Sequence, residues 1–144
     1  MTTTMQWFGP GEGPLDDCHA IRVEVFCSEQ GYSLTDEMDD QDPVAHHLLL
    51  RQNGLPTGTG RLLIQPGGTV RLGRIALRRS ARGAGAGAAL VAEMIRRAQA
   101  LGARQIVVDA QCRVVGFYEK CGFAVSGEEH MDGHVPHVWM TWQG

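Results

Sequence analysis

Long hydrophobic runs are absent from the 144-residue chain, and their absence argues against a membrane-spanning helix. No apolar stretch approaches the roughly 18 residues that a helix needs to cross a bilayer. The N-terminal segment also lacks a basic region followed by an apolar core, which is the pattern of a secretory signal peptide. We therefore expect a cytoplasmic protein that has no membrane partner.

Paired metal-binding residues are also lacking. The four cysteines form no C-x-x-C pair, so the thiols are expected to be reduced and a zinc site is not indicated. His130, His134 and His137 lie close in sequence, but Gly133 and Pro136 between them favour a turn and a strand. A helical face that would gather the three imidazoles is not expected, and we predict no metal.

Positive charge is scarce overall, since the formal net charge is −3. Because general nucleic-acid binders are usually basic on at least one face, a nucleic-acid partner is not expected. The charge is unevenly spread, however. Residues 28–42 hold six acids and no Lys or Arg, whereas residues 71–82 hold five arginines and no acid. Two solvated loops and two ligand-binding surfaces both remain open as interpretations.

Hydrophobic periodicity predicts one domain, residues 1–144, that mixes helices and strands. No repeat, low-complexity tract or linker divides the chain. Expected strands cover 4–8, 46–52, 57–65, 69–79, 104–110, 122–131 and 134–142, and expected helices cover 15–28, 85–101 and 113–121. The second to fourth strands are close enough in sequence to form an antiparallel meander. The acidic segment is expected to be a loop or a short helix.

A glycine-rich stretch precedes the longest expected helix. Gly83, Gly85 and Gly87 alternate with alanines behind a cluster of arginines. The start of a helix exposes unpaired N–H groups, and glycine lets an anion approach them, so this stretch favours a phosphate site. A plain flexible loop, or close packing of helix on sheet, is the alternative. A Walker A loop is excluded because no Lys-Ser or Lys-Thr follows, and the glycine spacing does not match the Rossmann fingerprint.

Five motifs in order identify a family resemblance. Arg82–Gly87 match R-x-x-G-x-G, and FYEKCGF (117–123) matches F-Y-x-K-x-G-F. Further matches lie in IRVEVFCSEQGY (21–32), EMDDQDPVAHHLLL (37–50) and GHVPHVWM (133–140). The chain resembles the GCN5-related N-acetyltransferases, in particular a small bacterial single-domain subgroup. The resemblance implies an α+β domain with a central mixed twisted sheet of about six to seven strands. Helices would cover both faces, and two strands would splay apart at the cofactor site.

The resemblance also implies acetyl-CoA as co-substrate and an amine as acceptor. The N–H groups of the glycine loop would bind the pyrophosphate, and the backbone of the preceding strand would pair with the pantetheine arm as an added strand does. Gln111, which stands where many members have Asn, and Phe117 would line the far wall, although Phe117 can equally be a core residue. The implied cofactor-binding residues are Ile75, Ala76, Leu77, Arg82, Gly83, Ala84, Gly85, Ala86, Gly87, Ala88, Gln111, Phe117 and Lys120.

Two residues are predicted to be catalytic. Tyr118 matches the family's usual acid for the leaving thiolate, with a structural tyrosine as the alternative. Glu37 is the predicted base, although Asp39, His46, His47, His137 and water remain open for this role. Glu29, Gln30, Asp39 and His137 are predicted to bind the acceptor. The acidic segment near the expected entrance suggests a cationic amine.

The predicted function is therefore acetyl transfer to a primary amine of a small molecule or a peptide. A non-catalytic acyl-CoA-binding module of the same fold is the alternative, and a nucleotide-binding protein is a third reading. The sequence leaves open the identity of the acceptor and the oligomeric state. Val138, Trp139 and Trp142 near the C-terminus suggest a homodimer face.

Overall fold

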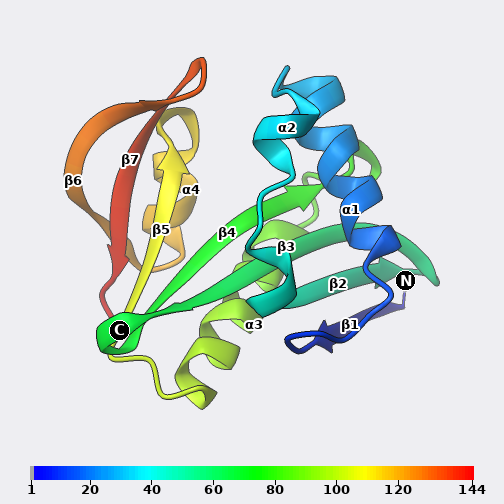
Figure 1. The fold of residues 1–144 in the computed structure, drawn as a ribbon, viewed down its shortest axis with the longest axis horizontal. Helices are drawn as coiled ribbons and strands as arrows, with labels where there is room; N and C mark the ends of the chain where they lie inside the picture. The colour runs from blue at the N-terminus through cyan, green and yellow to red at the C-terminus, as the bar shows by residue number, and fades with distance from the viewer. Residues whose placement is uncertain (1) are drawn as a thin grey trace.

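The computed structural model describes residues 2–144, in which alternating and apolar segments form a seven-stranded sheet (Figure 1). The strands are β1 (Thr3–Phe8), β2 (His46–Gln52), β3 (Leu55–Gln65), β4 (Thr69–Leu77), β5 (Gln105–Gln111), β6 (Phe123–Asp132) and β7 (Val135–Trp142). Their order across the sheet is β1-β2-β3-β4-β5-β7-β6. Only the β4–β5 pair is parallel, and the other neighbours are antiparallel. The sheet is therefore mixed, as predicted.

Helices cover both faces of this sheet. On one face lie α1 (Asp16–Arg22), the π-helical segment Val23–Glu29 and the short α2 (Leu34–Glu37); on the other lie α3 (Ala86–Ala100) and α4 (Val115–Lys120) (Figure 1). Short 3-10 turns occupy Asp42–Val44, Pro66–Gly68, Arg79–Ala81 and Cys112–Val114. Leu90, Met94 and Ala98 of α3 repeat at helical spacing and are fully buried on one side of the helix. No helix within residues 2–144 is long and apolar enough to cross a membrane.

The first helix differs from the expected one in its second half. The predicted range 15–28 is helical, but from Val23 the hydrogen bonds widen to the π pattern, with the Gln30 N–H donating to the Val25 carbonyl at 3.1 Å. Gly31, at φ +78°, then ends the helix. Apolar spacing does not separate an α turn from a π turn, because Ile21 and Val25 face the sheet in both. Single-turn π segments are common beside functional sites.

The sheet divides into two parts between β4 and β5. Their parallel pairing runs only from Thr69–Gln105 to Leu72–Val108, although both strands continue beyond it. Just past this point Arg74 adopts φ +48°, and the β3–β4 register shifts between Thr59 and Arg61. Such a bulge bends the strand that carries it. β4 therefore stays with β3, while β5 stays with β7, and the two parts diverge (Figure 1). The predicted splay is present.

Candidate active site

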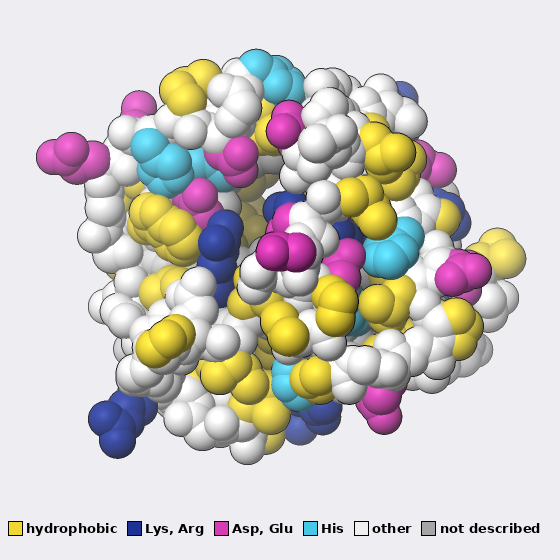
Figure 2. Space-filling view, viewed as in Figure 1, with side chains coloured by type: hydrophobic (Ala, Val, Ile, Leu, Met, Phe, Trp, Pro, Cys, Tyr) yellow, Lys and Arg dark blue, Asp and Glu magenta, His cyan; other side chains and the backbone are white. Residues whose placement is uncertain are grey.

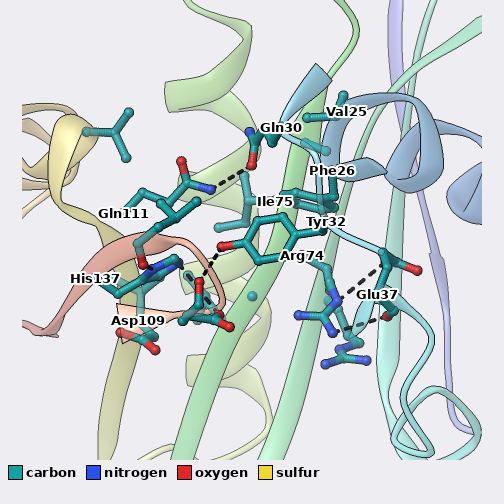
Figure 3. A pocket seen from close by; sticks show the side chains of 18 of the residues that line it. Val25, Phe26, Gln30, Tyr32, Glu37, Arg74, Ile75, Asp109, Gln111 and His137 are labelled. Atoms are coloured by element: carbon teal, nitrogen blue, oxygen red, sulfur yellow. Dashed lines mark hydrogen bonds and ion pairs between the residues drawn. The ribbon is translucent and has the colours of Figure 1, made fainter. Parts of the chain in front are cut away.

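The divergence of β4 from β5 opens a cavity of about 980 Å³. Its walls come from these two strands, the π-helical segment, the loop after it and the β6–β7 hairpin. Figure 2 shows the hollow on this face, with basic and acidic side chains side by side at its rim. The side chains that line it converge from both parts of the sheet (Figure 3).

Three predicted cofactor residues lie on the free stretch of β4. Ile75, Ala76 and Leu77 follow the bulge and remain paired with β3 on one side, Ala76 opposite Thr59. Toward β5 this stretch has no strand partner among residues 2–144. Because an extended strand leaves half of its N–H and C=O groups on each side, this edge can pair with another extended group. All three residues line the cavity.

The glycine loop leads into the N-terminus of α3. Gly83 and Gly85 have φ values of +89° and +77°, and a Cβ at either would meet no atom within 4 Å. No side chain caps the helix, whose first N–H groups have no partner within the helix. Gly87 differs: a Cβ there would lie 3.3 Å from the Phe117 ring. Close packing thus explains Gly87, whereas the exposed left-handed glycines leave room for a ligand, and an anion site there stays a prediction.

Two basic residues expected near the phosphates have different surroundings. Arg82 donates to the Leu77 carbonyl and to Glu29 Oε1, each at 2.7 Å, and so ties the glycine loop to the π-helical segment. Lys120 lies with Ala88 in a second, smaller hollow beside α3 and does not line the main cavity. Its contact with a cofactor stays a prediction.

Tyr118 lies on α4 and faces the cavity from the α3 side of the sheet. Its side chain is 7% exposed and packs edge-on against Phe117 and Phe123, with ring centroids 5.1 and 5.8 Å away. Burial raises the pKa of the phenol well above its usual value. The hydroxyl therefore keeps its proton at neutral pH, as a hydrogen-bond donor to a leaving thiolate must.

Glu37, the predicted base, is buried in a network of ion pairs. Its Oε1 accepts from Arg22 Nε and lies 3.4 Å from Arg74 Nε. Asp39 accepts hydrogen bonds from Arg61 at 2.7 and 2.9 Å and from Arg74 at 3.2 Å. Asp42 accepts one from Arg22 at 2.9 Å and one from Arg61 at 3.0 Å. Protonating Glu37 would weaken two pairs, so this setting counts against the base role, which stays a prediction.

Direct contacts bridge the cavity between its two walls. Gln111 on β5 donates to the side chain of Gln30 at 2.7 Å, and His134 in the β6–β7 turn lies 2.6 Å from the Gln30 carbonyl. Tyr32 donates to the Asp132 carbonyl at 3.0 Å and packs on the His134 ring (Figure 3). These contacts bring the predicted pair Gln30 and Gln111 together. Tyr32 and His134 were not predicted as site residues, although both lie in segments that carry the family resemblance.

A second group of polar side chains lies beside the cavity on β4, β5, β6 and β7. Asp109 Oδ2 lies 3.0 Å from His130 Nε2, and this hydrogen bond raises the pKa of His130. The Arg71 guanidinium lies over the Trp139 ring, 4.9 Å from its centroid. His137, a predicted acceptor residue, is buried next to this group and lines the cavity. Sequence reasoning missed Arg71 and Asp109, although both are charged residues inside apolar strands.

No group of three or more His, Cys, Asp or Glu side chains suited to a metal ion occurs in the described part of the chain. The four thiols are free, and none of them lines the main cavity. The cavity is lined by backbone groups, carboxylates, arginines and histidines, and by Tyr118.

Comparisons with known proteins agree with this geometry. A family model described as an acetyltransferase (GNAT) domain matches residues 14–143. A Bacillus subtilis relative is 36% identical over 135 residues, covering 92% of this chain and 91% of its own. The uncharacterized N-acetyltransferase YjcF of Bacillus subtilis is 32% identical, covering 90% and 92%. The crystal structure of an acyl-CoA N-acyltransferase from Pseudomonas aeruginosa superposes with a TM-score of 0.88 at 26% identity, covering 99% and 100%.

Proposed function

Because the chain belongs to the GNAT acetyltransferase family, we propose that it transfers an acetyl group from acetyl-CoA to the nitrogen of a primary amine. Membership of the family implies an acyl-CoA donor and an acceptor. The specific donor and the amine are our proposal. One observation carries it: the cavity opens where β4 and β5 part, beside the uncapped N-terminus of α3.

The residues present fit the two ends of such a donor. The N–H groups from Gly83 to Ala88, together with the positive end of the α3 dipole, suit a pyrophosphate. The unpartnered edge of Ile75–Leu77 suits the two amides of a pantetheine arm, which would lie along it as an added strand. Bound in this way, acetyl-CoA supplies a thioester carbonyl in the gap between the strands.

Tyr118 is proposed to assist the leaving thiolate. Its phenol is buried and protonated, packs edge-on against Phe117 and lines the cavity. A thiolate is stable enough at neutral pH that this assistance lowers the barrier without being indispensable. The amine must lose a proton to attack. Since Glu37 is held by Arg22 and Arg74, water in the open cavity is the better-supported acceptor of that proton.

A matched pair of glycine substitutions tests the donor site. Gly85→Val places a side chain in the open space above the helix N-terminus, and we expect loss of acetyl-CoA binding by calorimetry. Gly102→Val, at φ +84° beyond the other end of α3, introduces a similar strain with nothing within 4 Å and should bind acetyl-CoA normally. Normal binding by the Gly85 variant would place the phosphate site elsewhere.

The catalytic claim is tested by thiol release. Wild-type protein with acetyl-CoA is screened against a library of amines, amino acids and peptides, and at least one class should accelerate thiol release. Acetyl-CoA binding without acceleration by any member would instead support the non-catalytic acyl-CoA-binding module.

A further inference from the structure

The arginines of the cavity differ in how they are neutralised. Arg61 and Arg74 are each bound by carboxylates, and Arg82 is bound by Glu29. Arg71 and Arg113 have no acidic partner within residues 2–144. Arg113 is exposed and donates to Gln111, whereas Arg71 is partly buried and makes no hydrogen bond to a described residue. Arg71 is therefore the partly buried arginine of the cavity whose N–H donors are all available to a ligand.

The orientation of Arg71 suits a planar anion. Its guanidinium carbon lies over the Trp139 ring, and none of its N–H groups donates a hydrogen bond to a described residue. The edge of a guanidinium carries pairs of parallel donors whose spacing matches the two oxygens of a carboxylate. Gly73, two residues along the same strand face, adds no side chain, and a Cβ there would meet nothing within 4 Å. Space for a ligand therefore adjoins the guanidinium.

Asp109 provides the opposite charge on the neighbouring strand. Arg71 pairs with Val107, so Asp109 lies two residues further along β5, with its Cα about 8 Å from that of Arg71 by strand spacing and rise. It is the first residue of β5 past the paired register, where the cavity begins. Asp109 Oδ2 bonds His130, but Oδ1 is buried and has no donor among the described residues. A buried carboxylate oxygen without a donor is unusual, and an ammonium group would supply one.

We infer that the acceptor carries a carboxylate as well as its amine: an amino acid or a related amino-carboxylate, with the carboxylate on Arg71 and the amine beside Asp109. This inference rests on the proposed function and names the substrate class. It replaces the expectation of a plain cationic amine from the acidic segment, because Glu37, Asp39 and Asp42 are already neutralised by arginines. Among the partly buried side chains of the cavity, Arg71 has no acidic partner and Asp109 keeps one oxygen without a donor, and this neighbouring pair matches a zwitterion.

The test compares amino acids with their carboxamides. Acetyl transfer to each pair is measured as kcat/KM per neutral amine, because the amide lowers the amine pKa. A charged hydrogen-bonded pair predicts that wild type prefers the acid by about 10- to 100-fold. Arg71→Gln should abolish this preference and leave the amides unchanged. Arg113→Gln removes the same charge from the same cavity and should retain the preference.

Equal rates for acids and amides in wild type, or equal effects of the two arginine variants, would overturn the inference. Calorimetric binding of the same pairs separates this failure from failure of the proposed function. Preferential binding of acids that depends on Arg71, without any thiol release, would leave the acceptor inference standing and refute the acetyltransferase proposal. Binding without preference for acids would refute the inference whatever the turnover.

Discussion

Removing Arg22 should destabilise the protein more than any surface change. Its side chain is 1% exposed and donates to Glu37 and Asp42, whose side chains are 1% and 10% exposed. Removing one partner of a buried pair leaves uncompensated charge and typically costs about 3–5 kcal/mol. Arg61 and Arg74 still face these acids, which places Arg22→Met toward the lower end of that range. The free energy of unfolding is measured by urea denaturation at pH 7.

The same variant should have a distinctive pH dependence. Burial raises the pKa of Asp42, but hydrogen bonds and charge from Arg22 and Arg61 outweigh burial and hold this pKa well below its usual 3.8. A carboxyl whose pKa is lower in the folded state stabilises the protein above the ordinary pKa, and this stabilisation is lost as the pH falls toward the folded value. The difference between wild type and Arg22→Met should therefore shrink below about pH 4.

Controls separate charge from packing. Arg96→Met breaks the pair with Glu93 on the outer face of α3, where Arg96 is 63% exposed, and should leave the unfolding midpoint nearly unchanged. Arg22→Lys keeps a charge but loses the planar fork and should lie between wild type and Arg22→Met. A loss below about 1 kcal/mol for Arg22→Met, or a loss that does not change with pH, would show that the network does not stabilise the fold.

Two further predictions concern single groups in the cavity. Tyr118→Phe keeps the packing of the ring and should lower kcat by about 10²-fold. The affinity for acetyl-CoA and the Tm should change little. A loss of stability without a loss of kcat would show that Tyr118 has only a structural role. Asp109→Asn should lower the pKa of His130 toward the ordinary 6.5, because the hydrogen bond that His130 makes to the Asp109 carboxylate raises this pKa. An NMR titration of the imidazole in which the pKa stays raised would show that another group controls it.

The fold could be predicted because local pattern and tertiary structure agree along most of the chain. Leu90, Met94 and Ala98 repeat every four residues and are buried together beneath α3. The Asp132-Gly133 turn joins two strands as expected. Two local features were missed. The π-helical hydrogen bonds of Val23–Glu29 and the positive φ of Arg74 depend on packing against other elements. The intrinsic preferences of these residues favour neither conformation.

The cavity could be predicted only in part. The glycine loop, the free edge of β4 and Tyr118 belong to motifs whose members are close in sequence, so the resemblance places them together. The bridging contacts between Gln30 and Gln111 and between Tyr32 and Asp132 join residues 81 and 100 positions apart. Neither contact has a signal in a single sequence. Lys120 shows the opposite case, since a motif position does not by itself bring its side chain into the cavity.

The acidic segment shows why a run of like charges in sequence does not define an electrostatic surface. Residues 28–42 contain no basic residue, which suggested a site for cations, yet Asp39 and Asp42 are matched by arginines from α1, β3 and β4. The field that a ligand meets depends on the charges left unpaired after folding, because paired charges largely cancel at a distance. Two of the charges that remain, on Arg71 and Asp109, lie on neighbouring strands at the wall of the cavity. The acceptor is therefore expected to match this pair, and the Arg71→Gln experiment addresses that expectation directly.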